Sequence, residues 1–128
     1  QFDVSPFVTV SMGDDVEQCM MPIRASMALY IGGMGARDKN FYNNYAKALG
    51  FADAAVEIQD LFLSGRKDEA AAAVPAELID ACHLVGPADR IKARLQRWKT
   101  AGNDGQVASM LLGCQQPEAL EVVAGEIL

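Results

Sequence analysis

The sequence predicts an α/β fold built on parallel strands. Residues 83–113, HLVGPADRIKARLQRWKTAGNDGQVASMLLG, hold two short apolar runs on either side of an amphipathic segment. This pattern is typical of a strand, a helix and a second, parallel strand. The 128 residues are 51% hydrophobic, which suits one domain with a sizeable core. Ligands of such folds bind at the carboxyl ends of the strands, so we expect functional residues in the turns that follow them.

The first elements are expected to be a strand and an interrupted helix. Phe2–Met12 is rich in Val, Phe and Thr and predicts a strand that Gly13 ends. Asp14 is the expected helix cap, with Glu17 at the spacing of a capping box. Pro22 interrupts the helical pattern, so we expect a kink or a restart of the helix there. The apolar stripe of this helix comprises Val16, Cys19, Met20, Ile23, Met27, Tyr30 and Ile31.

The middle of the chain is expected to be mostly helical. Gly32–Gly35 predicts a flexible turn because it contains three glycines. Apolar spacing, with Gly or Pro following each segment, then predicts a succession of helices. These are Phe41–Leu49, Ala52–Leu63, Asp68–Val74 and Ala76–Ala81.

The last part of the chain predicts a strand, a helix, a strand and a final helix. The first of these strands is expected at Cys82–Val85. Pro87 is the expected first residue of the following helix, and Gly102 is expected just past its end. The second strand ends near Gly113, and the final helix begins near Pro117. The helix between the strands has a predicted buried stripe of Ile91, Leu95 and Trp98.

Three parallel strands alone would form a small sheet with open edges. The chain also opens directly on a strand-like run, QFDVSPFVTV, without an initiator Met. We therefore interpret residues 1–128 as a single partial domain, the carboxyl-terminal part of a (β/α)8 barrel. Because such a barrel needs about 250 residues, roughly half of it is expected to be missing.

The composition excludes several classes of protein. No apolar run reaches the ~20 residues of a membrane span, and the start lacks the pattern of a signal peptide. The three cysteines, without CxxC spacing, indicate reduced thiols in a cytoplasmic protein and no metal site. The net charge of −6 argues against a nucleic-acid partner. The five basic residues between Arg90 and Lys99 are interpreted as a solvated helix face.

Three segments carry a resemblance to a known family. They are Ala28–Tyr42 (ALYIGGMGARDKNFY), Ala55–Leu61 (AVEIQDL) and Leu84–Ile91 (LVGPADRI). The chain resembles the carboxyl-terminal part of luciferase-like oxidoreductases over nearly its whole length. It is most similar to the actinobacterial branch that uses the deazaflavin coenzyme F420. The first segment is far more specific than the third, whose turn is common across the superfamily. Ala101–Gln106 departs from the family pattern, which leaves the register of the final strand open.

The resemblance implies a monooxygenase-like barrel that binds coenzyme F420, or FMN in sister branches, at the carboxyl ends of its strands. The implied reaction is hydride transfer between the reduced deazaflavin and a small organic substrate, in a protein expected to form a homo-oligomer. In such families the amino-terminal half supplies many cofactor contacts. No residue of this chain is assigned a catalytic role.

The segment from Gly32 to Tyr42 is the strongest candidate for cofactor binding. Its glycines let a ligand approach the backbone closely, and its cations could neutralise the phosphodiester and polyglutamate groups of F420. The alternative is that the glycines only end a helix and that the charges are solvated. Ser11 and Thr9 lie near the carboxyl end of the first strand, and one of the two is expected to face the barrel mouth. Its hydroxyl group could contact the cofactor or make a structural hydrogen bond. The predicted cofactor-binding residues are Gly32, Gly33, Gly35, Arg37, Lys39 and Ser11.

For the other residues that could take part in binding or catalysis, a structural role is the favoured interpretation. The Gly86–Asp89 turn could bind an anion, but a capped helix start is favoured because Asp89 already satisfies the dipole. His83 lies at the wrong end of its strand for a catalytic base. Buried inert thiols, core-packing methionines and solvated acidic residues are expected elsewhere, namely Cys82, Cys114, Met20, Met21, Met27, Asp53, Glu57 and Asp60.

Two other functions stay open at this point. A truncated barrel could act as a non-catalytic binding or oligomerisation module, with its strand edges covered by another copy. A small unrelated α/β binding protein would also fit the pattern of strands and helices alone.

Overall fold

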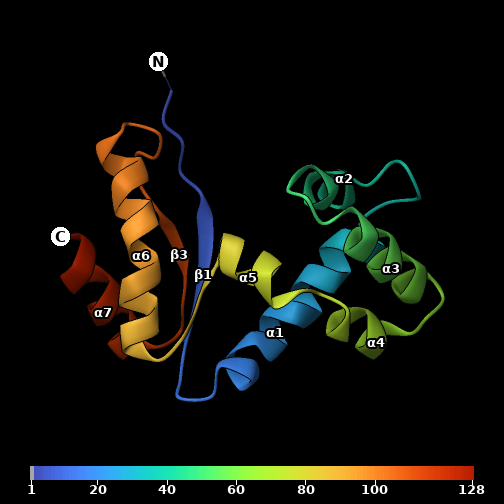
Figure 1. Ribbon diagram of the computed structural model, residues 1–128, viewed down its shortest axis with the longest axis horizontal. Coiled ribbons are helices and arrows are strands. Elements are labelled where there is room, and N and C mark those ends of the chain that lie inside the picture. The colour runs from blue at the N-terminus through green and yellow to red at the C-terminus, as the bar shows by residue number, and fades with distance from the viewer. Residues whose placement is uncertain (1) are drawn as a thin grey trace. The chain divides into compact units, whose positions relative to one another are not determined.

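The computed structural model describes residues 2–128, which divide into two compact units. The sheet unit comprises the chain up to Met20 together with Cys82–Leu128, and the helical unit comprises Met21–Ala81. The predicted order of strand, several helices, strand, helix, strand and helix is confirmed (Figure 1). The mixed α/β class is therefore confirmed, and the two units are described separately.

The sheet unit is built on a parallel sheet of three strands. They are β1 (Phe7–Met12), β2 (Leu84–Gly86) and β3 (Leu111–Gly113). Their spatial order is β2-β1-β3, so β1 is central and pairs in parallel with both neighbours. Consecutive strands are neighbours in a (β/α)8 barrel, whereas β1 separates β2 from β3 here. The parallel strands agree with part of a luciferase-like barrel, and the closed barrel itself is not formed by these residues.

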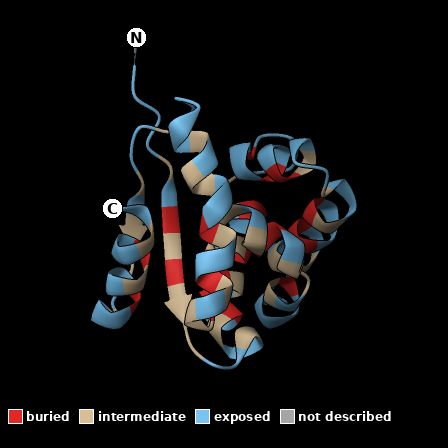
Figure 2. Cartoon of the chain, turned by 60° about the vertical axis from the view of Figure 1, so that its left-hand side comes forward, coloured by how far each residue is buried: buried red, intermediate tan, exposed pale blue. Residues whose placement is uncertain are grey.

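Two helices, α6 (Ala88–Asn103) and α7 (Pro117–Ile127), pack on the sheet. Along β1 the buried residues alternate with more exposed ones, as Figure 2 shows by colour. This alternation places one face of the strand against the helices. The predicted stripe of α6 is confirmed. The buried core comprises Val8, Val10, Leu84, Ile91, Leu95, Ala119 and Val123, with Trp98 partly buried against it.

The start of the chain differs from the prediction in two details. Strand β1 begins at Phe7 rather than Phe2, since Pro6 has no N–H to donate to a ladder. The carbonyl group of Pro6 still accepts a hydrogen bond from Leu111 N at 2.9 Å. Asp15, rather than Asp14, caps the first helix, because its carboxylate accepts from Gln18 N at 3.1 Å.

The bounds around β2 and α6 also shift. Strand β2 begins at Leu84 because the preceding helix, α5 (Ala76–Cys82), continues through Cys82. Pro87 is the residue before the first helical residue of α6, with extended backbone angles. Gly102 lies within α6, which ends one residue later. The prediction that Gly102 lies just past the end of this helix is therefore wrong.

The helical unit opens with α1 (Val16–Ala28), whose first residues belong to the sheet unit. The helix runs through Pro22 without a restart. Pro22 is exposed, so water can satisfy the Gln18 carbonyl group that lacks an N–H partner there. A π-helical segment, η1 (Leu29–Gly33), follows α1 directly. The predicted Gly32–Gly35 turn is therefore wrong for its first two glycines.

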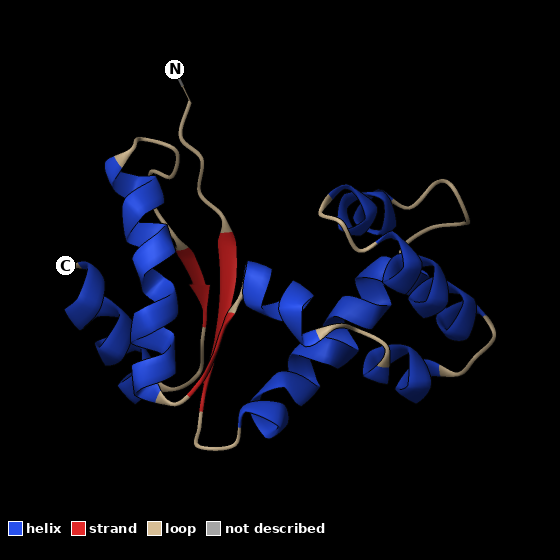
Figure 3. Cartoon of the chain, viewed as in Figure 1, coloured by secondary structure: helices blue, strands red, loops and turns tan. Residues whose placement is uncertain are grey.

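Three further helices complete this unit before α5 (Figure 3). Helix α3 (Ala52–Leu63) has the predicted bounds, and α2 (Phe41–Ala48) ends one residue earlier than predicted. Helix α4 (Lys67–Ala72) begins and ends earlier than the predicted Asp68–Val74. The core of the unit consists of small and branched side chains, among them Ala55, Ile58, Ala70, Leu78 and Ile79.

Candidate functional site

The carboxyl ends of β1 and β2 lie side by side at one edge of the sheet. Met12, the last residue of β1, is in register with Gly86, the last residue of β2. Gly13 N donates to Gly86 O at 3.1 Å, which extends the pairing one residue past the strand. The turns that follow these strands therefore start from a fixed backbone, at the edge where ligands of parallel α/β folds gather.

Thr9 and Ser11 share one face of β1. The core residues Val8 and Val10 alternate with them, so both hydroxyl-bearing side chains lie on the face away from α6 and α7. Ser11 is in register with Val85, one residue before the carboxyl end of β1. The expectation that only one of the two could face the barrel mouth is wrong, because residues two apart on a strand point the same way. Ser11 lies nearer to the carboxyl edge.

The turn after β2 is shaped by Gly86. Its φ of +107° lies in the region that favours glycine, and a Cβ atom there would lie 2.9 Å from Cδ of Arg90. The Arg90 guanidinium donates to Val85 O at 2.8 Å. Arg90 is therefore part of the turn, so the interpretation of all five basic residues as a solvated face is wrong for this one. Asp89, in the first turn of α6, complements the helix dipole as expected.

His83 has a structural role at the start of β2. Its Nδ1 atom accepts a hydrogen bond from Thr9 N at 3.0 Å, which requires that this nitrogen carry no proton. Burial lowers the pKa of His83 from its ordinary value of 6.5. The histidine thus pairs with β1 in its neutral form, at the end of the strand away from the carboxyl edge.

The glycines of η1 are explained by packing. A Cβ atom on Gly32 would lie 2.5 Å from Cβ of Phe62, and one on Gly33 would lie 2.4 Å from the Phe62 ring. A Cβ on Gly35 would lie 2.8 Å from Lys39 O. Helix α3 thus approaches the backbone of η1 where side chains are absent. This close approach accounts for Gly32 and Gly33 without a ligand, and contact of these glycines with a cofactor stays a prediction.

Two buried asparagines, which the sequence analysis did not single out, hold this segment together. Asn40 Nδ2 donates to Tyr30 O and Ile31 O, both at 3.0 Å. Asn43 Nδ2 donates to Ile31 O at 3.1 Å and to Ala55 O at 2.8 Å. Asn40 Oδ1 also accepts from Asn43 N at 3.0 Å and caps α2. An Asn directly before a helical run is a cap signal that could have identified Asn40.

The cations of the segment lie at the protein surface. Arg37 forms an ion pair with Asp60 of α3, and both side chains are more than half exposed. Lys39 is also exposed. Asp53, Glu57 and Asp60 are exposed as expected, and Asp60 is in addition the ion-pair partner of Arg37. An exposed ion pair of this kind contributes little to stability, so the guanidinium can exchange Asp60 for another anion at small cost.

The thiols and methionines have mainly structural surroundings. All three cysteines are free, and burial raises the pKa of the Cys82 thiol, which disfavours the reactive thiolate. Met20 is buried in the core as expected, whereas Met21 is 61% exposed, so core packing was wrong for Met21. Within residues 2–128 no cluster of His, Cys, Asp or Glu could hold a metal ion, and no helix could cross a membrane.

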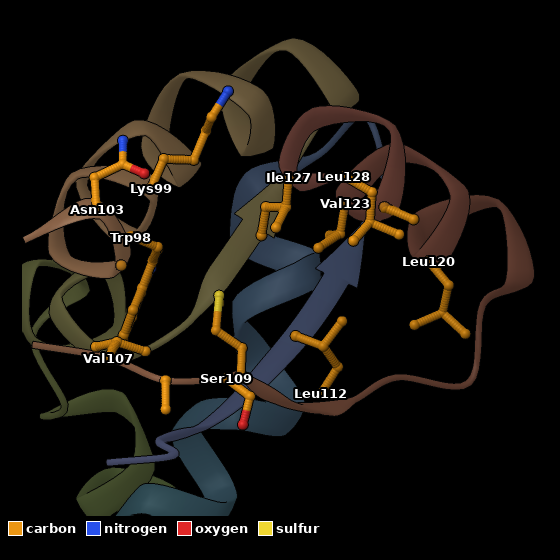
Figure 4. A pocket seen from close by; sticks show the side chains of 14 residues that line it. Trp98, Lys99, Asn103, Val107, Ser109, Leu112, Leu120, Val123, Ile127 and Leu128 are labelled. Carbon is orange, nitrogen blue, oxygen red and sulfur yellow. The ribbon is translucent and has the colours of Figure 1, made fainter. Parts of the chain in front are cut away.

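A cavity of about 560 Å³ lies in the sheet unit, away from the carboxyl edge. It is bounded by residues of α6 and α7, by residues 107–110, which lead into β3, and by Leu112 of β3. Trp98 and Val107 lie across the cavity from Val123 and Ile127 (Figure 4). None of the predicted site residues lines it. Its lining is mostly apolar and lies at the amino end of β3, so it differs in place and chemistry from the predicted cofactor site.

Comparison with known proteins identifies the family. Residues 1–105 match the family of luciferase-like monooxygenases, and the chain belongs to that family. Over 101 residues, 79% of the chain, it is 37% identical to a Mycobacterium tuberculosis protein provisionally named a coenzyme F420-dependent oxidoreductase. Those residues cover 29% of that relative, so the chain spans less than a third of its length. No solved structure matches the chain. The family predicted from the three segments is confirmed.

Proposed function

We propose that this chain is part of an oxidoreductase that uses coenzyme F420 and a small organic substrate. The observation that carries the proposal is the 37% identity, over most of the chain, to a protein named for F420 within the luciferase-like family. The FMN alternative has no comparable support from that relative. When bound, F420 would exchange a hydride with the substrate, and this chain would bind and orient the coenzyme.

The chemistry of the available side chains suits an anionic coenzyme. Arg37 and Lys39 are exposed cations on the loop that follows η1. Ser11 presents a hydroxyl group near the carboxyl end of β1. Phosphodiester and carboxylate groups accept hydrogen bonds from such donors, and bidentate pairing is available to the guanidinium. In this proposal the role of Gly32, Gly33 and Gly35 is to let the loop that bears the cations fold closely against its surroundings.

The test is a titration of the natural-length protein with F420, followed by the fluorescence of the deazaflavin. Arg37→Ala is expected to weaken F420 affinity about fivefold or more, because it removes one charge-assisted contact. Arg66→Ala is the matched control. Arg66 also forms an exposed ion pair in the helical unit, with Glu69, and its side chain has nearly the same exposed fraction as that of Arg37.

The control separates a specific contact from a general effect of charge. Arg66→Ala is expected to leave F420 affinity unchanged, and Asp60→Asn, which releases Arg37 from its partner, is expected to strengthen binding slightly. Equal affinity of Arg37→Ala and the unaltered protein would overturn the role of Arg37. Tighter binding of FMN than of F420 by the unaltered protein would overturn the choice of coenzyme.

A further inference from the structure

Strand β1 extends beyond its neighbour β3. Pairing between the two ends at Thr9 and Gly113, while β1 continues to Met12. On the other side β1 remains paired with β2 as far as Met12 and Gly86. The side of Met12 that faces away from β2 therefore lies beyond the β1–β3 ladder.

The side chain of Gln116 takes the place of a strand partner for Met12. Met12 N donates to Gln116 Oε1 at 2.8 Å, and Gln116 Nε2 donates to Met12 O at 2.9 Å. The main-chain carbonyl group of Gln116 meanwhile accepts from Ala119 N at 3.0 Å and so begins helix α7. One residue thus joins the start of α7 to the carboxyl end of β1.

The backbone on both sides of Met12 is consequently fixed. Gly13 N bonds to Gly86 O on the β2 side, and the Gln116 amide bonds to Met12 on the opposite side. Ser11 directly precedes this doubly held residue, and its side chain lies on the face away from α6 and α7. A change in the backbone direction at Met12 would therefore turn the Ser11 hydroxyl.

We propose that Gln116 is a positioning residue that sets the direction of the Ser11 hydroxyl toward bound F420 by holding both main-chain polar atoms of Met12. This inference rests on the proposed function. Gln116 lies outside residues 1–105, which match the family, so the family assignment gives it no role. It acts through backbone hydrogen bonds and need not touch the coenzyme.

The first test measures hydrogen exchange of the Met12 amide in the natural-length protein without coenzyme. Gln116→Ala removes the acceptor of that N–H, so its exchange is expected to be about fivefold faster or more. Gln116→Met, which has a similar length and lacks both polar atoms, is expected to do the same. The exposed neighbour offers the matched control, since Gln115→Ala is expected to leave the exchange unchanged. Unchanged exchange in both Gln116 variants would overturn the proposal.

The second test is a double-mutant cycle on F420 affinity. Gln116→Ala is expected to weaken binding about threefold to tenfold when Ser11 is present and to have almost no further effect in Ser11→Ala. An equal loss in both backgrounds would assign Gln116 a general structural role and overturn the positioning role. A Ser11→Ala variant with unchanged affinity would overturn it as well, because there would be no contact to position.

The two proposals fail in different ways. If the unaltered protein does not bind F420, the proposed function fails, and the positioning of Ser11 for that coenzyme fails with it. If F420 binds and Arg37→Ala weakens binding while the Gln116 cycle shows no coupling, the function stands and only the positioning role is lost.

Discussion

Replacing Asn43 tests whether the buried amides hold the helical unit together. Asn43 is 2% exposed, and its Nδ2 group donates to the carbonyl oxygens of Ile31 and Ala55. Asn43→Ala removes both hydrogen bonds and leaves a small void. Ile31 O retains its hydrogen bond from Asn40 Nδ2, so this carbonyl group loses only one of its two side-chain donors.

The magnitude follows from these contacts. Each lost hydrogen bond lowers the free energy of unfolding by about 1 kcal/mol. Because the carbonyl group of Ala55 also loses its side-chain donor in a buried site, we expect a total loss of about 2–3 kcal/mol. Urea denaturation followed by circular dichroism measures the change in the free energy of unfolding.

Asn44→Ala is the matched control for this change. Asn44 is the next residue of α2, has the same side chain and is exposed. Both substitutions gain the same helix propensity, so the difference between them isolates the buried contacts. We expect Asn44→Ala to change the free energy of unfolding by less than about 0.5 kcal/mol. If the two variants agree within that margin, the buried amide network does not stabilise this unit.

Two further outcomes concern stability. Gly32→Ala is expected to destabilise the protein by about 1–3 kcal/mol because its Cβ would overlap Phe62, whereas Gly125→Ala, in a helix with open space around it, should stabilise by about 0.5–1 kcal/mol. If Gly32→Ala and Gly125→Ala shift the denaturation midpoint in the same direction, the packing argument is contradicted. His83 is half-buried and has a lowered pKa, so the unfolded chain takes up its proton at a higher pH than the folded chain. The free energy of unfolding should therefore decrease as pH falls below 6.5, and less so in His83→Asn, whose amide oxygen can still accept from Thr9 N. Parallel pH profiles of the two proteins between pH 7.5 and pH 5 would refute this role.

The sequence predicted correctly those helices and strands that depend on residues close together in the chain. Helix α3 has the predicted bounds because its apolar spacing begins after Gly50 and stops before Gly65. The stripe of α6 was predictable because Ile91 and Leu95 repeat with helical spacing and meet a sheet on one side only. Class and order of elements follow from such patterns. The strand order β2-β1-β3 does not, because pairing depends on contacts between residues far apart in the sequence.

The errors at the candidate site have long-range causes. The glycines of η1 resembled a flexible turn because their partner, Phe62, lies in another helix. Gln116 gave no signal, since its significance depends on the point where β3 stops pairing with β1. Thr9 and Ser11 could have been assigned to one face from the sequence, because a strand has a period of two residues. The positions of Ser11 and Arg37 are now known, but their contact with a cofactor stays a prediction.

The segment that most specifically indicated the family is also held in place by packing and by buried hydrogen bonds. Gly32 and Gly33 leave room for Phe62. Asn40 donates to the carbonyl groups of Tyr30 and Ile31 within the segment, and Asn43, the residue directly after it, donates to those of Ile31 and Ala55. These tasks exist whether or not a coenzyme binds, so these four residues cannot distinguish a cofactor site from a structural motif. Arg37 can, because its exposed ion pair with Asp60 gives the fold little and leaves the guanidinium available to an anion. The cofactor hypothesis for this segment therefore depends on the difference in F420 affinity between Arg37→Ala and Arg66→Ala.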